Sequence, residues 1–180
     1  TGATGNMGWA GFQELYKRKE RFDIRILARD SKKNREKLDP YLADPSVTVV
    51  WGDLMNYADV LKGVSGSDYV LHVGGMVSPA ADYYPEKTLK VNVGAAENVV
   101  KAVLAQPDAS QIKVVYIGSV AQYGDRNPPY HWGGADEPQT PAKYDMYALS
   151  KIRSEEIFAN AGPRAVSSSV FIWPSRLARV

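Results

Sequence analysis

The chain opens with a glycine-rich loop, Thr1-Gly2-Ala3-Thr4-Gly5-Asn6-Met7-Gly8, which constrains the fold more than any other feature. Its three glycines are spaced by three residues and precede an apolar stripe at helical spacing. Glycine lacks the Cβ atom that would hold a phosphate away from the main chain. A helix beginning near Asn6 would direct unpaired N–H groups and the positive end of its dipole toward that phosphate. The loop therefore predicts a nucleotide-binding site, with an ordinary glycine-rich turn as the alternative.

The composition is that of one compact globular domain, with 180 residues and 44% hydrophobic content. Lys and Arg number 22 against 20 Asp and Glu, so no overall field attracts nucleic acid or a membrane surface. The absence of cysteine excludes disulfides and thiolate metal sites and fits a reducing compartment. No apolar run is long enough to cross a membrane. We expect a soluble, cytoplasmic protein that binds no metal.

The chain begins inside the glycine loop, without an initiator Met or a hydrophobic strand before it. A dinucleotide-binding loop normally follows a buried strand. We therefore expect the first strand of the sheet to lie before Thr1 in a longer protein.

Helix-like and strand-like segments alternate along the rest of the chain. Helical patterns occur at 7–19, 29–37, 53–61, 85–105 and 143–161. Runs of β-branched and aromatic residues predict strands at 22–28, 47–51, 69–73, 113–117 and 168–173. Nearly continuous apolar strands are typical of a parallel sheet covered by helices on both faces. We predict an α/β fold with a Rossmann-type doubly wound parallel sheet.

Several glycine and polar residues fall at or just beyond the predicted carboxyl ends of strands. Ligands of open parallel sheets bind at this edge, near the point where the strand order reverses. The residues that would share one site there are Gly2, Arg29, Asp53, His72, Ser119 and Pro174.

Arg29 lies 21 residues beyond Gly8, at the end of the strand that follows the first helix. An acidic residue at this place holds the adenosine ribose 2′-hydroxyl of NAD, whereas an arginine accommodates the 2′-phosphate of NADP. Arg29 comes first here, and Lys32, Lys33 and Arg35 add positive charge. We predict NADP, with NAD held by Asp30 as the alternative.

Tyr147 and Lys151 are the candidate catalytic pair. Residues four apart share a helix face, so the phenol and the ammonium would lie side by side. A nearby cation favours the phenolate and lowers the pKa of the tyrosine. The phenol would then exchange a proton with a substrate hydroxyl or carbonyl while hydride moves to or from a nicotinamide. Ser119, at a strand end, would donate to the same substrate oxygen.

A second Tyr-x-x-x-Lys pair occurs at Tyr83 and Lys87. Short motifs of this kind arise by chance, so context has to separate the two matches. Tyr83 precedes Pro85 in an irregular stretch, whereas Tyr147 lies near the start of a predicted helix. We therefore assign the catalytic role to Tyr147.

Together, these ordered motifs resemble the extended short-chain dehydrogenase/reductase family, of the nucleotide-sugar epimerase/dehydratase type. The resemblance covers essentially the whole chain. It rests on the glycine loop, Asp53-Leu54 as the adenine-contacting pair, the stretch 72–79 beside the nicotinamide ribose, Val91-Asn92-Val93, the serine segment 115–124, and the pair Tyr147 and Lys151.

The resemblance implies a role for each matching residue. Tyr147 would be the general acid/base, and Lys151 would lower its pKa and bind the nicotinamide ribose. Ser119 would polarise the substrate oxygen, and Asn92 would support the geometry of the catalytic tetrad. The implied cofactor-binding residues are Gly2, Gly5, Asn6, Met7, Gly8, Arg29, Asp53, Leu54, His72, Gly74, Tyr147, Lys151 and Pro174.

The chain departs from the family pattern in two places. Trp173-Pro174 stands where family members often carry Arg-Pro, and the loop 125–141 is long and aromatic, with Tyr130, His131 and Trp132. Both departures put a nucleotide-sugar substrate in doubt and make a more apolar carbonyl or alcohol conceivable. We interpret His131 as a surface-loop residue rather than a catalytic base.

We therefore expect residues 1–180 to form a partial NAD(P)-binding Rossmann domain whose substrate region lies beyond Val180. The predicted function is NAD(P)-dependent oxidoreduction of a small-molecule hydroxyl/carbonyl pair. An NAD-dependent nucleotide-sugar epimerase or dehydratase is the alternative within the family, and a non-catalytic dinucleotide sensor or scaffold is the alternative outside it. The family often forms homodimers through the two long helices, here 85–105 and 143–161.

Overall fold

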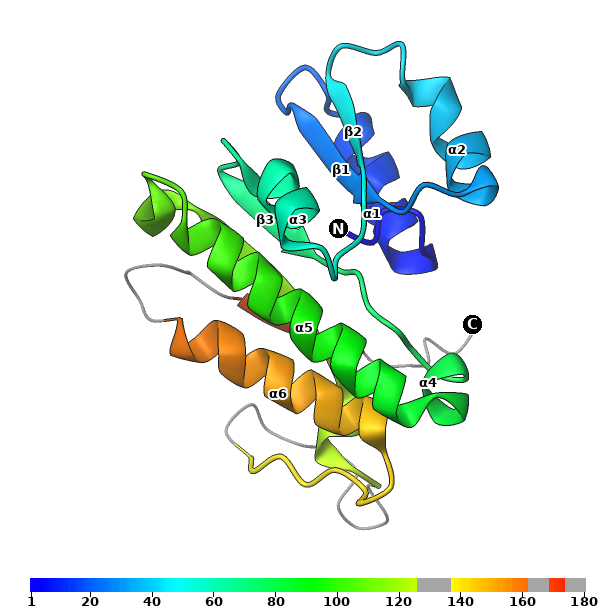
Figure 1. Ribbon diagram of the computed structural model, residues 1–180, viewed down its shortest axis with the longest axis vertical. Coiled ribbons are helices and arrows are strands. Elements are labelled where there is room, and N and C mark those ends of the chain that lie inside the picture. The colour runs from blue at the N-terminus through cyan, green and yellow to red at the C-terminus, as the bar shows by residue number, and fades with distance from the viewer. Residues whose placement is uncertain (126–136, 162–168, 174–180) are drawn as a thin grey trace.

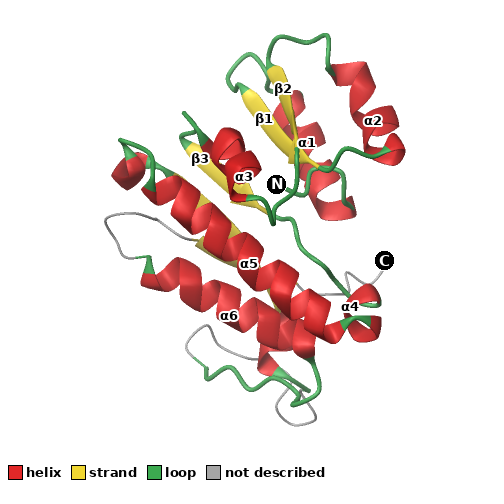
Figure 2. Ribbon diagram, in the orientation of Figure 1, coloured by secondary structure: helices red, strands yellow, loops and turns green. Residues whose placement is uncertain are grey.

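The computed structural model describes residues 1–125, 137–161 and 169–173, in which helices and strands alternate (Figures 1 and 2). The strands are β1 (Ile24–Ala28), β2 (Val47–Trp51), β3 (Tyr69–His72), β4 (Lys113–Ser119) and β5 (Ser169–Trp173). The α-helices are α1 (Asn6–Tyr16), α2 (Lys32–Leu38), α3 (Tyr57–Val64), α4 (Ala80–Tyr83), α5 (Pro85–Leu104) and α6 (Met146–Asn160). Short 3₁₀ helices are η1 (Asp39–Tyr41), η2 (Ala109–Gln111) and η3 (Val120–Tyr123).

All strand pairings in the described residues are parallel, which confirms the predicted sheet type. β1 pairs with β2, and β3, β4 and β5 form a second sheet in that order. The register places His72 opposite Tyr116 in β4. Because parallel strands run in the same direction, the residues after β3 and β4 emerge at the same edge.

Within the described residues, β1 and β3 are not paired with each other. The nitrogen of Thr1 donates to the carbonyl oxygen of Leu71 in β3 at 2.7 Å, so the start of the chain lies beside this strand. We expected the first strand of the sheet to lie before Thr1, and that expectation stays a prediction.

The larger hydrophobic core lies between the β3–β4 sheet and three helices, α3, α5 and α6. α5 and α6 run side by side across the sheet (Figure 1). Buried aliphatic and aromatic side chains from both layers fill the space between them, and they include Val60, Val99, Val103, Val114, Tyr116 and Phe158. A smaller core packs α1 and α2 against β1 and β2, with Phe12, Ile26 and Leu38 buried.

The predicted elements are all present, and their bounds shift at caps. α3 begins at Tyr57 rather than near Asp53, because the side chain of Asn56 caps it by accepting from the Ala58 N–H at 3.0 Å. α3 therefore starts four residues after its predicted start at residue 53. α6 begins at Met146 rather than Lys143, because Asp145 accepts from the Ala148 N–H at 2.8 Å.

Other boundaries differ by a few residues. β1 begins at Ile24 instead of residue 22, α1 ends at Tyr16 instead of residue 19, and α2 begins at Lys32 after the capping Ser31. β4 continues to Ser119, two residues beyond its predicted end. Tyr83, placed in an irregular stretch by the sequence, closes the short helix α4.

Candidate active site

The glycine loop leads directly into α1. Close packing requires glycine at two of its three glycine positions, Gly2 and Gly8, but not at Gly5. Gly2 has a φ of 74°, and a Cβ there would lie 2.5 Å from the nitrogen of Gly74. A Cβ on Gly8 would lie 2.1 Å from the carbonyl oxygen of Gly2. Packing of the protein against itself therefore excludes a side chain at both positions.

Gly5 is different, because a Cβ there would meet only the Gly2 carbonyl oxygen, at 3.4 Å. Gly5 is the exposed N-cap of α1 and makes no side-chain capping bond. The first N–H groups of a helix have no intrahelical partner, and here they belong to Asn6, Met7 and Gly8. The loop thus offers a bare main chain and free donors to an anion, which is the arrangement that binds dinucleotide phosphates.

Buried polar contacts anchor the loop to the end of β3. The hydroxyl of Thr1 accepts from the Gly74 N–H at 3.2 Å and pairs with Nδ1 of His72 at 3.0 Å. On the opposite side, the ammonium of Lys37 donates to the carbonyl oxygen of Thr4 at 3.0 Å. The loop is therefore held from both the β3 side and the α2 side.

His72 lies in the core, with 2% of its surface exposed. Burial is the largest influence and lowers the pKa of this histidine to about 3, with the positive charge of Lys151 acting in the same direction. The imidazole is therefore neutral at physiological pH and packs beside the rings of Tyr116 and Phe158. The buried His72 side chain anchors the start of the glycine loop, and its predicted place in the cofactor site stays a prediction.

At the end of β1, two arginines have different surroundings. Arg35 donates to both carboxylate oxygens of Asp30, at 2.6 and 2.7 Å, and its guanidinium lies over the Trp51 ring. The hydrogen bond from Arg35 lowers the pKa of the Asp30 carboxyl. In the described part of the chain, the exposed guanidinium of Arg29 has no hydrogen-bond or ion-pair partner. Arg29 is therefore an exposed cation that a ligand at this end could bind.

The segment after β2 is held close to the glycine loop. Oδ1 of Asp53 accepts from the Met55 N–H at 2.8 Å, and the carbonyl oxygen of Leu54 accepts from Asn98 at 2.8 Å. A Cβ on Gly74 would lie 2.9 Å from a methyl carbon of Leu54. The predicted adenine contacts of Asp53 and Leu54 stay predictions.

Ser119, Tyr147 and Lys151 come together at the carboxyl end of β4. Ser119 ends this strand and caps η3, while Tyr147 and Lys151 lie on the first two turns of α6. A hydrogen bond with Ser119 favours the ionised Tyr147. The ammonium of Lys151 lies 5.9 Å from the Tyr147 ring centroid and donates to the carbonyl oxygen of Ile117 at 2.7 Å. The predicted spacing thus brings the phenol and the ammonium to one place.

The protonation of this pair differs from the sequence prediction. Burial is the largest influence on Tyr147 and raises its pKa above the ordinary value, with Asp145 acting in the same direction. Burial also lowers the pKa of Lys151 to about 8. The sequence predicts a lowered pKa for Tyr147, whereas the structure gives a raised one, because burial outweighs the hydrogen bond with Ser119.

Asn92 supports the start of α6 through a buried chain of hydrogen bonds. Its amide donates to Oγ of Ser150 at 2.8 Å, and Ser150 donates to the carbonyl oxygen of Tyr147 at 2.7 Å. The same amide also bonds both main-chain groups of Met76, at 2.7 and 3.0 Å. Asn92 therefore links the segment after β3 to the turn of α6 that carries Tyr147.

Three further residues around the site were missed by the sequence analysis: Gln122, Ser150 and Glu155. Gln122 follows Ser119 by three residues, and this Ser-x-x-Gln spacing is a capping-box signal. Nothing in the spacing of Ser150 and Glu155 indicates their partners.

Some predicted residues lie outside the described part of the chain. These are Pro174 and the loop residues Tyr130, His131 and Trp132. Among the described residues, no group of His, Cys, Asp and Glu could hold a metal ion, and no helix is long and apolar enough to cross a membrane.

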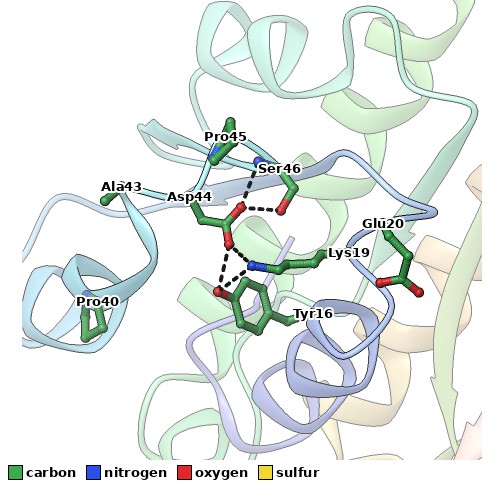
Figure 3. Close-up of a pocket in the computed structure, with 8 residues that line it drawn as sticks. All are labelled: Tyr16, Lys19, Glu20, Pro40, Ala43, Asp44, Pro45 and Ser46. Atoms are coloured by element: carbon green, nitrogen blue, oxygen red, sulfur yellow. Dashed lines mark hydrogen bonds and ion pairs between the residues drawn. The ribbon is translucent and has the colours of Figure 1, made fainter.

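A separate surface pocket lies between the end of α1 and the segment before β2 (Figure 3). Its polar centre is Asp44, which accepts from Tyr16 at 2.8 Å, from Ser46 at 2.7 Å and from Lys19. The hydrogen bond from Lys19 is the largest of several that hold the pKa of Asp44 well below its usual range. The carboxylate is saturated by these partners and fastens α1 to β2, away from the carboxyl ends of the strands.

A parallel sheet with a glycine loop at the first helix and polar residues at the strand ends defines the doubly wound dinucleotide-binding class. A profile of the NAD dependent epimerase/dehydratase family matches residues 1–177. The chain belongs to this family, which confirms the resemblance inferred from the motifs.

Known proteins with similar sequences or structures agree with this assignment. Over 106 residues the chain is 34% identical to a UDP-glucose 4-epimerase of Rickettsia bellii (strain RML369-C), a match that covers 57% of this chain and 31% of that protein. The UDP-Glc/GlcNAc 4-epimerase of Campylobacter jejuni has a TM-score of 0.79 at 19% identity, covering 95% of this chain and 51% of that one. The dTDP-glucose 4,6-dehydratase DesIV of Streptomyces venezuelae, solved with NAD bound, has a TM-score of 0.75 at 19% identity, covering 95% and 53%. The chain thus spans about half the length of the two enzymes of known structure.

The three-glycine arrangement yields a stability prediction. We expect Gly8→Ala to lower the free energy of unfolding by about 1–3 kcal/mol, because the new methyl group would overlap main chain that has no room to move. The matched control is Gly11→Ala in the same helix, where a Cβ meets nothing within 4 Å. That control should raise the free energy of unfolding by roughly 0.5–1 kcal/mol. Urea denaturation of both variants measures the difference, and equal effects would contradict the packing described here.

Proposed function

We propose that this chain binds a nicotinamide dinucleotide and exchanges hydride between it and a hydroxyl or carbonyl group of a small molecule, with Tyr147 as the general acid/base. The observation that carries the proposal is the meeting of Ser119, Tyr147 and Lys151 at the strand edge where the glycine loop also lies. The two are connected through the core, because His72 pairs with Thr1 at the start of the loop and stacks beside Tyr116, whose hydroxyl donates to the carbonyl oxygen of Lys151 at 3.1 Å.

The glycine loop supports the cofactor part of the proposal. The space left by the missing side chain of Gly5 and the first N–H groups of α1 fit a pyrophosphate. Arg29 and Asp53 would lie toward the adenosine, and Lys151 would bind the nicotinamide ribose. When bound, the nicotinamide supplies or accepts the hydride.

The residues around the reacting atoms support the proton transfer. Tyr147 has a raised pKa, so its phenol is protonated at neutral pH and can donate to a carbonyl oxygen. For the reverse direction the phenol must lose its proton, which the ammonium of Lys151 and the hydrogen bond with Ser119 favour. The Ser119 hydroxyl would donate to the same substrate oxygen and fix it against the phenol.

The comparisons favour an epimerase or dehydratase within this chemistry. The relatives of known name act as UDP-glucose 4-epimerase and dTDP-glucose 4,6-dehydratase. We therefore propose a nucleotide sugar as the substrate class, with the hydride returned to the sugar rather than released as reduced cofactor. This places the alternative of the sequence analysis ahead of net oxidoreduction.

Net oxidoreduction with NADP is the second candidate, and a specific contact favours it. Arg35 neutralises Asp30, the residue that would otherwise hold the ribose of NAD, while Arg29 is unpaired in the described part of the chain. A guanidinium in this position suits a 2′-phosphate. Dimerisation through α5 and α6, a cytoplasmic location and the single partial domain also stay predictions.

Tyr147→Phe tests the catalytic assignment. We expect the substitution to lower turnover by about 10²- to 10⁴-fold, because the proton donor is lost, and to leave dinucleotide affinity within about twofold. The matched control is Tyr144→Phe, the same change at a side chain that is 82% exposed and three residues away. Steady-state kinetics and fluorescence titration on the full-length protein measure both effects. Unchanged turnover in Tyr147→Phe would contradict the assignment of Tyr147 as the acid/base, whereas a native protein that binds the dinucleotide without any turnover would favour a non-catalytic sensor.

Arg29→Ala tests the choice of cofactor. Loss of a charged hydrogen bond of about 1.5–3 kcal/mol should weaken NADP binding by roughly 10- to 100-fold and leave NAD binding unchanged. Arg21→Ala, an exposed arginine before the other end of β1, is the control and should change neither affinity. Equal weakening of both dinucleotides in Arg29→Ala, or no weakening of either, would contradict NADP preference.

The two candidates differ in what happens to the cofactor. Incubation with a nucleotide sugar should give an isomerised or dehydrated sugar without accumulation of reduced cofactor if the chain is an epimerase or dehydratase. Stoichiometric consumption of added NADPH or NADP, followed at 340 nm, would favour net oxidoreduction instead.

A further inference from the structure

Ser119 is fixed at the end of β4 by a reciprocal pair of hydrogen bonds. Its main-chain N–H donates to Oε1 of Gln122 at 2.6 Å, and its hydroxyl accepts from the Ala121 N–H at 3.3 Å. This capping box joins the strand to η3 and determines where the Cα–Cβ bond of Ser119 points. The position of the hydroxyl thus depends on Gln122.

Gln122 is completely buried, and both ends of its amide are used. The oxygen faces the N–H of Ser119, while the NH₂ group donates to Oε2 of Glu155 on α6. A carboxylate only accepts, so Glu155 allows only the NH₂ end of the amide to face it. The flipped amide would set two donors against each other at Ser119 and two acceptors at Glu155.

Glu155 also holds the chain segment that precedes α6. The amide of Gln139 donates to the same carboxylate oxygen at 3.0 Å, and the hydroxyl of Thr140 donates to the carbonyl oxygen of Tyr123 at 3.2 Å. A Cβ on Gly124 would lie 2.3 Å from the Thr140 carbonyl oxygen, so this segment packs tightly on the end of η3. One carboxylate therefore ties together α6, η3 and the segment 137–145.

We propose that Glu155 is a positioning residue that acts through Gln122 to hold Ser119 in line with Tyr147. Tyr147 and Glu155 are both on α6, so the tie fixes Ser119 to the same helix that carries the phenol. This inference rests on the proposed function, because the alignment matters only if both hydroxyls meet one substrate oxygen. The requirement at position 155 is an acceptor for the Gln122 amide, rather than a negative charge.

Amide hydrogen exchange tests the coupling without any turnover. In Glu155→Met and in Gln122→Met, we expect the Ser119 amide to exchange about tenfold faster, because the bond to its acceptor is weakened or lost. Glu155→Gln keeps an acceptor oxygen and should exchange at close to the native rate. Glu156→Met removes an exposed carboxylate from the next position of the same helix and should change nothing. Native exchange at Ser119 in Glu155→Met would overturn the proposal.

Kinetics of the same variants of the full-length protein test the catalytic consequence. Glu155→Met and Gln122→Met should each lower kcat by about 10- to 100-fold, as misplacement of a catalytic group does, with KM for the dinucleotide unchanged. The double variant should be no slower than the worse single variant, because both remove one connection. If the losses in kcat of the two single variants multiply in the double variant, the proposal that Glu155 acts through Gln122 is wrong. A Glu155→Gln variant as slow as Glu155→Met would also overturn it.

The outcomes separate this inference from the proposed function. If Tyr147→Phe abolishes turnover while Glu155→Met leaves kcat unchanged, the positioning role is wrong and the proposed function stands. If Tyr147→Phe has no effect, the proposed function fails, and the positioning role fails with it.

Discussion

The site depends on the close approach of the glycine loop to the end of β3. The main chain of Gly2 lies where only a glycine fits, against Gly74, and the Thr1 hydroxyl bonds Gly74 and His72. This contact sets the start of α1 beside β3, and β4 is the next strand. The start of α1, where we propose that the pyrophosphate binds, and the carboxyl end of β4, which carries Ser119, thereby share one edge. A side chain at position 2 would push the loop away from β3 and separate the two halves of the proposed cofactor site.

Buried polar contacts, more than apolar packing, define the catalytic end. Asn92 reaches Tyr147 through Ser150, and Ser119 is held by Gln122. Such bonds are directional, and a buried polar group without its partner is costly, so a complete network favours one arrangement. Burial raises the pKa of Tyr147, so its phenol is protonated at neutral pH. Burial also lowers the pKa of Lys151 to about 8, so its ammonium group loses a proton more readily than that of an exposed lysine. The proposed hydride chemistry requires a proton donor and acceptor, and Tyr147 is the residue that we propose for this role.

The fold was predictable from sequence because each strand is a short apolar run and each helix has a periodic stripe. β2 matches its predicted bounds at both ends. The exact helix starts were harder to predict, because more than one Asp, Asn or Ser residue near a start can act as the N-cap. The N-cap of α3 is Asn56, whereas the sequence placed the start of this helix at Asp53. At the site, the Tyr147–Lys151 spacing was enough to place the pair together. The protonation of that pair was not predictable, because it follows from burial, and the Gln122–Glu155 bond joins residues 33 positions apart whose spacing carries no periodic signal.

The most direct test of the proposed cofactor site is a crystal structure of the full-length protein with NAD or NADP bound. We expect the pyrophosphate at the main-chain N–H groups that follow Gly5, and the nicotinamide ribose within hydrogen-bonding distance of Lys151. The nicotinamide ring should then face the space between Ser119 and Tyr147. A dinucleotide bound away from the glycine loop, or a nicotinamide turned away from Tyr147, would contradict the proposed site.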